Sequence, residues 1–240
     1  FEKAAYEMMA NPNHNLNMEL FTEKLMIAQC SKLQELTCGF EFAQALRFFW
    51  KASRTTDENE KLTQREAVLR WFRGDYRSNQ EAKKAIGINT IITDENWFDF
   101  IILWAQFFVI AGYKGFIVLI DEIVNIYKAA SGITRQMNYE KMLMMYNATL
   151  QGKAEYLGII MSGIPMSIYD KKRGVFSYEA MRSRLSTGIY QEPRLTNMMT
   201  PIIKVLPLTK EEMYILLEKL SEIHAELYEY PKIVTEDELM

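Results

Sequence analysis

Two adjacent carboxylates, Asp121 and Glu122, directly follow a run of five apolar residues and could support chemistry. The run, Phe116–Ile120, is typical of a strand that is buried on both faces of a parallel sheet. Ligands of such sheets bind at the carboxyl ends of the strands, where this pair is expected to lie. Carboxylates withdrawn from water are costly unless a positive group compensates them. The alternative is an acidic turn that ends a core strand.

A magnesium ion bound to a nucleotide would compensate both charges, because Mg²⁺ is held by few protein carboxylates together with waters and phosphates. Asp121 is predicted to hold the ion through water, and Glu122 to polarise the water that attacks the γ-phosphate of ATP. An apolar strand that ends in Asp-Glu is the Walker B pattern of a P-loop ATPase. These residues therefore predict ATP and Mg²⁺ as cofactors.

A second polar residue is predicted at the same edge of the sheet. Residues 156–161 form another apolar run, and Ser162 follows it. ATPases of the AAA+ kind carry a polar residue at the end of the strand beside Walker B, where it orients the attacking water. Ser162 is the candidate for that role. The alternative is that Ser162 and Gly163 only begin the turn that Pro165 continues.

Two arginines, Arg182 and Arg184, lie in the predicted helix MRSRL, ahead of a third predicted strand at residues 202–206. They are two positions apart, so they point to different faces of the helix. One of them could reach the nucleotide of a neighbouring subunit as an arginine finger, because a planar guanidinium suits the charge that develops on a transferring phosphate. The alternative is a pair of solvated surface arginines. The order of these features along the chain is that of AAA+ proteins.

Strands that alternate with helices in the second half of the chain predict an α/β fold, a parallel sheet flanked by helices. Residues 202–206 are predicted to be its third strand. Thr209 and Glu212 form a capping box that opens a last long helix. The N-terminal half is predicted to be helix-rich, and a second capping box there is formed by Thr63 and Glu66.

The bulk composition excludes a generally basic protein. The chain has 240 residues, of which 49% are hydrophobic, and its formal net charge is -3, so it carries no global positive field for nucleic acid or a membrane surface. Binding to DNA would need a local basic patch. The candidates for such a patch are Arg70, Arg73, Arg77 and the KKRG sequence at residues 171–174.

The cysteines and the hydropathy pattern predict a cytoplasmic protein without a membrane span. The spacing of Cys30 and Cys38 fits neither a disulfide framework nor a zinc pair, which indicates a reducing environment. The most apolar stretch, residues 97–120, is interrupted by Asp99 and Gln106. It therefore lacks the roughly 20 consecutive apolar residues that a spanning helix needs.

One expected motif is missing, because no G-x-x-x-x-G-K-[ST] occurs in the sequence. The only Gly-Lys pair, Gly152 and Lys153, is followed by Ala. Without this Walker A loop the phosphates lack their main backbone cradle. The chain begins at Phe1 and ends soon after a capping box at residues 235–238, so we expect a fragment whose Walker A loop lies ahead of Phe1. The alternative is a degenerate protein that binds ATP poorly.

Several stretches of the chain resemble a P-loop ATP-binding family of BREX-type phage-exclusion systems, the BrxC and BrxD kinds of protein. These stretches are REAVLRWFRGDY with AKKAIGI, then AGYKGFIVLIDEIVNIYK, then LGIIMSGIPMSIYDKKRGVFSYEAMRSRL. The resemblance runs from about Phe40 to about Ala225. Its most specific parts are the W-x-x-G element at residues 71–74 and GYKGFIVLIDE.

The resemblance implies an AAA+-like ATPase that acts in defence against phage, with a Walker A loop ahead of the region. It matches Asp121 and Glu122 to the Walker B motif of the family. RSRL resembles the arginine motif of the replication-initiator branch of AAA+ proteins, which makes Arg184 the first finger candidate and Arg182 the second. The partners implied are ATP, other phage-defence proteins, further copies of the chain and DNA.

The expected organisation follows from these assignments. Residues 1–207 are predicted to form a P-loop NTPase core that lacks Walker A and carries a helical insertion at about residues 18–111, and residues 208–240 to begin a C-terminal helical lid that is cut short. The first functional hypothesis is an ATPase that couples hydrolysis of Mg-ATP to conformational change. The second is a non-hydrolysing P-loop scaffold that binds protein or DNA. An unused buried carboxylate pair would cost stability, which argues against the scaffold.

Overall fold

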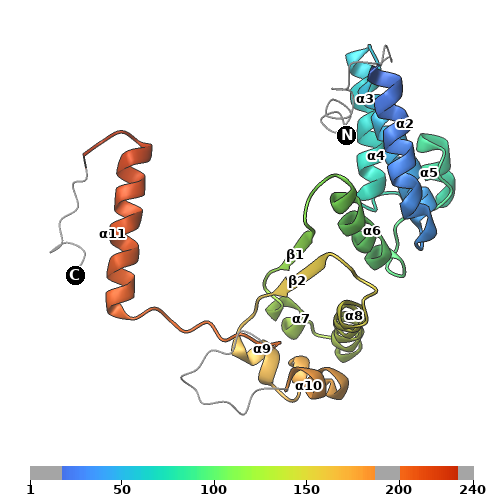
Figure 1. Cartoon of the computed structure of the whole chain (residues 1–240). Coiled ribbons are helices and arrows are strands. Elements are labelled where there is room, and N and C mark those ends of the chain that lie inside the picture. Colours follow the sequence, from blue (N-terminus) through green and yellow to red (C-terminus); the bar gives the residue numbers. More distant parts are fainter. Residues whose placement is uncertain (1–17, 187–200, 232–240) are drawn as a thin grey trace. The chain divides into compact units, whose positions relative to one another are not determined.

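The computed structural model describes residues 18–186 and 201–231 (Figure 1). The chain divides into two units, Phe1–Met181 and Arg182–Met240, and each is considered by itself. The described part of the first unit begins with a helical segment and continues into a small parallel sheet with its helices. The described part of the second unit consists mainly of one long helix.

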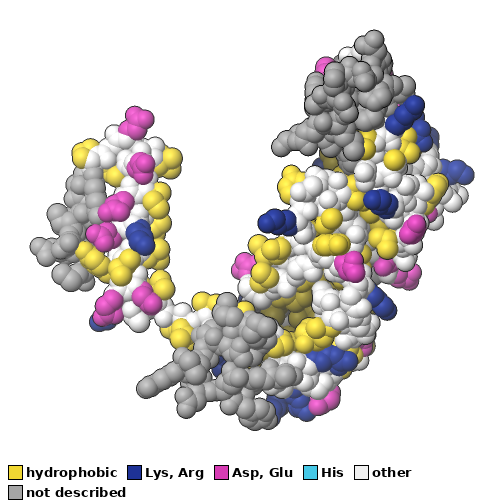
Figure 2. Space-filling model, in the orientation of Figure 1, with side chains coloured by type: hydrophobic (Ala, Val, Ile, Leu, Met, Phe, Trp, Pro, Cys, Tyr) yellow, Lys and Arg dark blue, Asp and Glu magenta, His cyan; other side chains and the backbone are white. Residues whose placement is uncertain are grey.

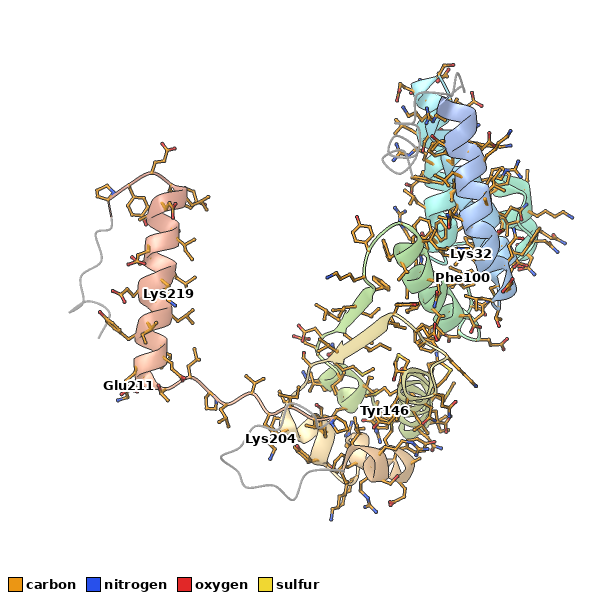
Figure 3. The ribbon with its side chains drawn as sticks, viewed as in Figure 1. Lys32, Phe100, Tyr146, Lys204, Glu211 and Lys219 are labelled. Carbon is orange, nitrogen blue, oxygen red and sulfur yellow. The ribbon has the colours of Figure 1, made fainter. Side chains whose placement is uncertain are left out.

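The helical segment is built around aromatic side chains. Phe42 and Trp71 are almost completely buried, and Phe100, labelled in Figure 3, lies with its ring centroid 5.2 Å from that of Trp71. Edge-to-face contacts of this kind add to the burial of the rings. The segment thus has a core of its own, without the predicted site residues. Its elements are α2 (Met18–Cys30), η1 (Ser31–Glu35), α3 (Gly39–Ser53), α4 (Glu58–Phe72), α5 (Asn79–Ile86) and α6 (Trp97–Ile110).

Helix α4 begins earlier than the sequence pattern predicts. Its N-cap is Asp57, whose Oδ1 accepts hydrogen bonds from the backbone N–H groups of Asn59 (2.8 Å) and Glu60 (3.1 Å). The predicted start at Thr63 is wrong, because this residue lies inside the helix and its hydroxyl donates to the carbonyl of Asn59 at 2.8 Å. Asp caps a helix at least as well as Thr, and Asp57 comes before Thr63 in the sequence, so the helix begins after Asp57.

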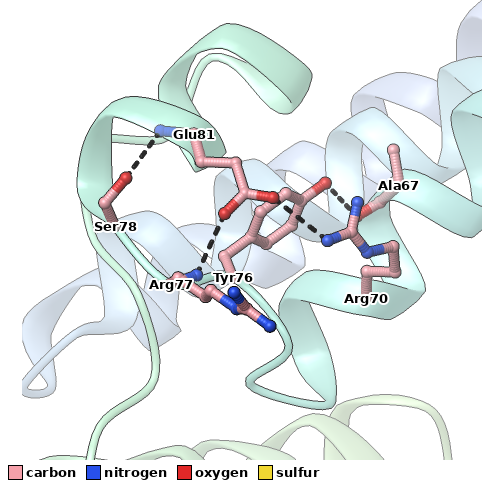
Figure 4. Close-up of polar contacts among 6 residues, drawn as sticks. All are labelled: Ala67, Arg70, Tyr76, Arg77, Ser78 and Glu81. Atoms are coloured by element: carbon pink, nitrogen blue, oxygen red, sulfur yellow. Dashed lines mark hydrogen bonds and ion pairs between the residues drawn. The ribbon is translucent and has the colours of Figure 1, made fainter.

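Glu81 joins α4 to α5 (Figure 4). Its carboxylate accepts hydrogen bonds from the backbone N–H of Arg77 and from Arg70 Nη2, both at 3.1 Å, and its own N–H donates to Ser78 Oγ at 3.2 Å. These hydrogen bonds, that of Arg77 first, lower the pKa of Glu81. The guanidinium of Arg70 also lies 4.6 Å from the ring centroid of Tyr76. The turn between the two helices is therefore fixed by polar contacts.

The predicted parallel pairing is confirmed by the first two strands. β1 (Phe116–Ile120) and β2 (Leu157–Met161) are parallel, in a register that sets Phe116 beside Leu157 and Ile120 beside Met161. The chain between them passes through α7 (Val124–Lys128) and α8 (Gly132–Leu150). After β2 come α9 (Pro165–Tyr169), η2 (Val175–Ser177) and α10 (Glu179–Leu185).

The burial expected for the first strand is wrong on one face. Ile117 and Leu119 are 64% and 72% exposed among the described residues, so one face of β1 is uncovered there. The other face is covered in part by α6, since the ring centroid of Phe108 lies 5.1 Å from that of Phe116. A continuous apolar run does not tell one covered face from two.

The third predicted strand is also wrong. Residues 202–209 have no regular secondary structure, and Val205 is 92% exposed. A strand needs a neighbour for its backbone hydrogen bonds, and no described strand pairs with this segment. The helix predicted after it is present as α11 (Lys210–Leu227), with the Thr209 and Glu212 capping box in place. In the view of Figure 2, apolar side chains follow one edge of α11 and acidic ones the other.

None of the helices that the structure describes is long and apolar enough to cross a membrane. The most apolar of them, α6, has 14 residues. That length is well below the roughly 20 residues that a span requires.

Candidate functional site

The ends of β1 and β2 bring three of the predicted site residues together. The backbone pairing continues past both strands, because the N–H of Ser162 donates to the carbonyl of Ile120 at 2.9 Å and the N–H of Ile123 donates to the carbonyl of Ser162 at 3.0 Å. Asp121 and Glu122 lie between these two hydrogen bonds in the sequence. The parallel register therefore places Asp121, Glu122 and Ser162 at one edge of the sheet, as predicted.

Asp121 and Ser162 are in direct contact. The Ser162 hydroxyl donates a hydrogen bond to Asp121 Oδ1, and the backbone N–H of Glu122 donates to the same oxygen at 2.8 Å. The Ser162 hydroxyl, and after it this N–H, holds the pKa of Asp121 below its usual range, because both stabilise the ionised form. Asp121 is consequently a carboxylate at neutral pH.

Glu122 has an unusual backbone and a nearby amide. Its φ angle is 53°, in the left-handed region that residues other than glycine rarely adopt. Such conformations cluster at functional sites. Its side chain is exposed, and Oε2 accepts a hydrogen bond from Asn125 Nδ2 at 3.4 Å. Asn125 was not foreseen, although its place three residues after Glu122 would have suggested a contact on one helical turn.

The exposure of the two carboxylates corrects one step of the sequence argument. Both Asp121 and Glu122 are exposed rather than withdrawn from water. The desolvation cost of the pair is therefore small, and the pair does not by itself require a cation. A nucleotide site at this edge is therefore supported by the positions of the residues and not by the charge of the pair alone.

Close packing behind the site depends on Gly163, which directly follows Ser162. A Cβ atom at this position would lie 2.5 Å from Ile123 Cγ1 and 2.8 Å from Ser167 Oγ, both closer than side chains tolerate. Ile123 and Ser167 are both buried, so neither can move away freely. Sequence inspection assigned Gly163 only to a turn, because its nearest neighbour in space, Ile123, lies 40 positions away in the sequence.

The residues present fit a magnesium ion that is held mainly by water and phosphate. Asp121 is ionised, and among the described residues its second oxygen, Oδ2, accepts no hydrogen bond. The described ranges contain no group of three or more His, Cys, Asp or Glu side chains that could hold a metal ion alone. A site with one or two carboxylates suits Mg²⁺, which keeps several waters and binds substrate phosphates.

The two arginines occupy the predicted helix. Arg182 and Arg184 lie in the last turn of α10. Both belong to the second unit, whereas the three residues of the strand ends belong to the first. Their role as fingers stays a prediction, since the units are described separately.

The candidate basic patch is smaller than the sequence suggests. Arg70 pairs with Glu81 at 3.1 Å and Arg73 with Glu66 at 2.6 Å, so two of the three arginines near the W-x-x-G element are partnered by carboxylates. In the KKRG sequence, Arg173 is half-buried and bound to backbone carbonyls. These contacts leave less positive charge available for DNA than the number of basic residues in the sequence indicates.

Replacement of Ser162 by Ala is expected to raise the pKa of Asp121 towards its ordinary value of about 3.9. The variant removes the strongest of the two hydrogen bonds that favour the ionised form. A carboxylate whose pKa is lower in the folded state stabilises the fold at pH values above its unfolded pKa, and this contribution is lost as the pH falls through its folded pKa. The stability of the Ser162→Ala variant should therefore depend less on pH in acid than that of the wild type. The measurement is a ¹³C NMR titration of the Asp121 carboxyl.

The matched control for this titration is Ser31→Ala, because the hydroxyl of Ser31 donates to the carbonyl of Ala28 and bonds to no carboxylate in the described ranges. The control should leave the pKa of Asp121 unchanged. An unchanged Asp121 pKa in the Ser162 variant would show that the hydrogen bond does not persist in solution.

The relation to a known family extends over nearly the whole chain. A family model described as BREX system ATP-binding protein BrxC/D matches residues 2–240. No curated protein and no solved structure matches the chain. The family match covers the helical segment, both strands and the later helices through α11.

Proposed function

Because the chain belongs to the family of BREX system ATP-binding proteins BrxC/D, we propose that its two strand ends form the water-activating half of an AAA+-like ATPase site. The family supports ATP binding in a BREX system. The observation that carries the proposal is the contact between Ser162 and Asp121 at the ends of two paired parallel strands. That is the edge of the sheet where α/β proteins bind their ligands.

Each residue of the site has a distinct role in the proposed hydrolysis. Asp121 would hold Mg²⁺ through water by its Oδ2 atom, while Oδ1 is held by Ser162 and by the N–H of Glu122. When bound, Mg²⁺ neutralises the charge on the β- and γ-phosphates. Glu122 Oε1 accepts a proton from the attacking water, and Asn125 keeps the other carboxylate oxygen in place. Ser162 holds Asp121 and completes the polar edge.

The proposal requires two groups from outside these strand ends. The phosphate-binding loop, whose motif is absent from the 240 residues, would have to be supplied from outside them. Arg184, or after it Arg182, contacts the nucleotide of a neighbouring copy, because both lie at the end of a helix and a guanidinium suits transferring phosphate. Residues 208–240, which include α11, begin a helical lid.

A scaffold that no longer hydrolyses ATP is the second candidate, and one observation favours it. Asp121 and Glu122 are exposed, so they could persist without a ligand at little cost to stability. In that case the domain would bind other phage-defence proteins or DNA through its surface.

Calorimetry of ATP with Mg²⁺ tests the proposal on the natural protein that contains these 240 residues. We expect this protein to bind, its Asp121→Asn variant to bind at least tenfold more weakly, and the 240-residue chain alone to bind neither ATP nor Mg-ATP. Asp94→Asn is the matched control, because Asp94 is an exposed acid whose ion pair among the described residues is with Lys141 at 3.0 Å. If the natural protein shows no binding at all, the ATPase proposal fails and the scaffold stands.

A further inference from the structure

Arg173 makes contacts that reach the segment following the two carboxylates. Its Nη2 atom donates hydrogen bonds to the carbonyls of Tyr127 and Ala129, each at 3.2 Å. Its guanidinium carbon lies 5.5 Å from the ring centroid of Tyr127. Tyr127 belongs to α7, which starts two residues after Glu122, whereas Arg173 follows β2 and α9. One side chain therefore connects the two segments that leave the edge of the sheet.

The turn that carries Arg173 is itself held by Asp170. Asp170 Oδ1 accepts hydrogen bonds from the N–H groups of Lys172 (2.7 Å) and Arg173 (3.1 Å), and these bonds, that of Lys172 first, lower the pKa of Asp170. Its Oδ2 accepts a hydrogen bond from the Tyr127 hydroxyl at 3.3 Å. The turn and α7 are thus joined twice, once by the arginine and once by the carboxylate.

A third element, α8, closes the arrangement. The Tyr139 hydroxyl donates to the carbonyl of Arg173 at 2.6 Å, and Arg135 Nη1 donates to the carbonyl of Ala129 at 2.6 Å. Tyr139 is buried, and Arg173 Nε is buried without a hydrogen bond to any described residue. Arg173 is half-buried, and its Nη2 atom is bound to two backbone carbonyls, so the side chain is held in place by the fold rather than free in solvent.

The position of α7 decides the geometry of the carboxylates. Ile123, the N-cap residue of α7, makes the N–H contact to the Ser162 carbonyl, and Asn125 of the same helix holds Glu122. A shift of α7 would weaken both hydrogen bonds and move Asp121 relative to Ser162. Anything that fixes α7 therefore also fixes the site.

We propose that Arg173 is a positioning residue that holds α7 against the segment after β2 and thereby keeps Asp121 and Ser162 in contact. Its effect on hydrolysis rests on the proposed function, but its effect on the Asp121–Ser162 contact does not. Arg suits the role because its planar fork can donate to two carbonyls at once, whereas the ammonium of Lys is a point charge. None of the roles assigned to the site residues includes Arg173.

The first arm of the test measures the site directly in the 240-residue chain. Arg173→Gln should raise the pKa of the Asp121 carboxyl in a ¹³C NMR titration, in the same direction as Ser162→Ala. Lys172→Gln is the control, because it removes the neighbouring exposed charge and leaves the contacts to α7 intact. Arg173→Lys should give an intermediate pKa, and it serves as the decisive variant if Arg173→Gln does not fold.

The second arm measures ATP turnover by the natural protein. Arg173→Gln should lower kcat at least tenfold with the KM for ATP within about threefold, and Arg173→Lys should recover part of kcat. A variant that unfolds at lower temperature but keeps the wild-type Asp121 pKa would overturn the proposal, since the role would then be purely structural. A changed pKa in a protein without ATPase activity would support the positioning role and reject the proposed function.

Discussion

Replacement of Glu122 by Gln is expected to lower ATP turnover by the natural protein at least a hundredfold while leaving Mg-ATP binding within about threefold. The amide has nearly the shape of the carboxylate and can still accept the Asn125 hydrogen bond through its oxygen. It cannot take a proton from the attacking water, and loss of a general base typically costs about 10²–10⁴ in rate. Phosphate release gives kcat, and calorimetry gives the affinity.

The matched control for this variant is Glu95→Gln, which changes an exposed glutamate ahead of α6 that lies outside the site. It should leave both turnover and affinity unchanged. A Glu122→Gln protein that hydrolyses ATP at the wild-type rate would remove Glu122 from the reaction. If the variant instead lost affinity to the same extent as turnover, the carboxylate would serve in binding and a different base would have to be sought.

The part of the site formed by the strand ends was predictable because it depends on local pattern and on a general rule. The apolar runs before Asp121 and Ser162 define two strands, and parallel strands bring their carboxyl ends to one edge. The sequence therefore predicts that Asp121 and Ser162 lie close together, and the structure adds the hydrogen bond between their side chains. The sequence could not reveal this bond, because it depends on the register of the strands and on the turn at Glu122.

The two errors about strands have a common physical origin in missing neighbours. The mainly β-branched and aliphatic residues 202–206 have strand propensity, but β propensity reflects a fit to surrounding strands rather than a backbone preference. With no described strand beside it, this segment has no regular secondary structure and is largely exposed. The exposed residues Ile117 and Leu119 on β1 illustrate the same point for a strand that does form.

Residues that act over long separations were beyond sequence inspection. Arg173 lies 46 positions after Tyr127, and within KKRG it looked like one of three solvated cations. Its burial follows only from the packing of α7, α8 and the Asp170 turn. Local charge counts therefore overestimate the basic surface wherever an arginine is folded onto backbone carbonyls.

The W-x-x-G element at residues 71–74, the most specific part of the family resemblance in the N-terminal half, functions in packing rather than in chemistry. Trp71 is 1% exposed, and its Nε1 donates to the carbonyl of Thr90 at 2.6 Å. Gly74 adopts a φ of 75°, a conformation that favours glycine, and turns the chain after α4. The element therefore anchors the helical segment, and its removal should lower the free energy of unfolding.

Trp71→Ala is expected to destabilise the 240-residue chain by about 3–5 kcal/mol, among the largest effects of any single core change. The variant removes the edge contacts with Phe72 and Phe100, each at 5.2 Å, and leaves the Thr90 carbonyl without its donor. Urea unfolding followed by circular dichroism measures the change. Leu62→Ala on the same helix is the control, because Leu62 is 61% exposed and should cost about 0.5 kcal/mol or less. A loss below 1 kcal/mol for Trp71→Ala would mean that the aromatic core does not hold the helical segment together.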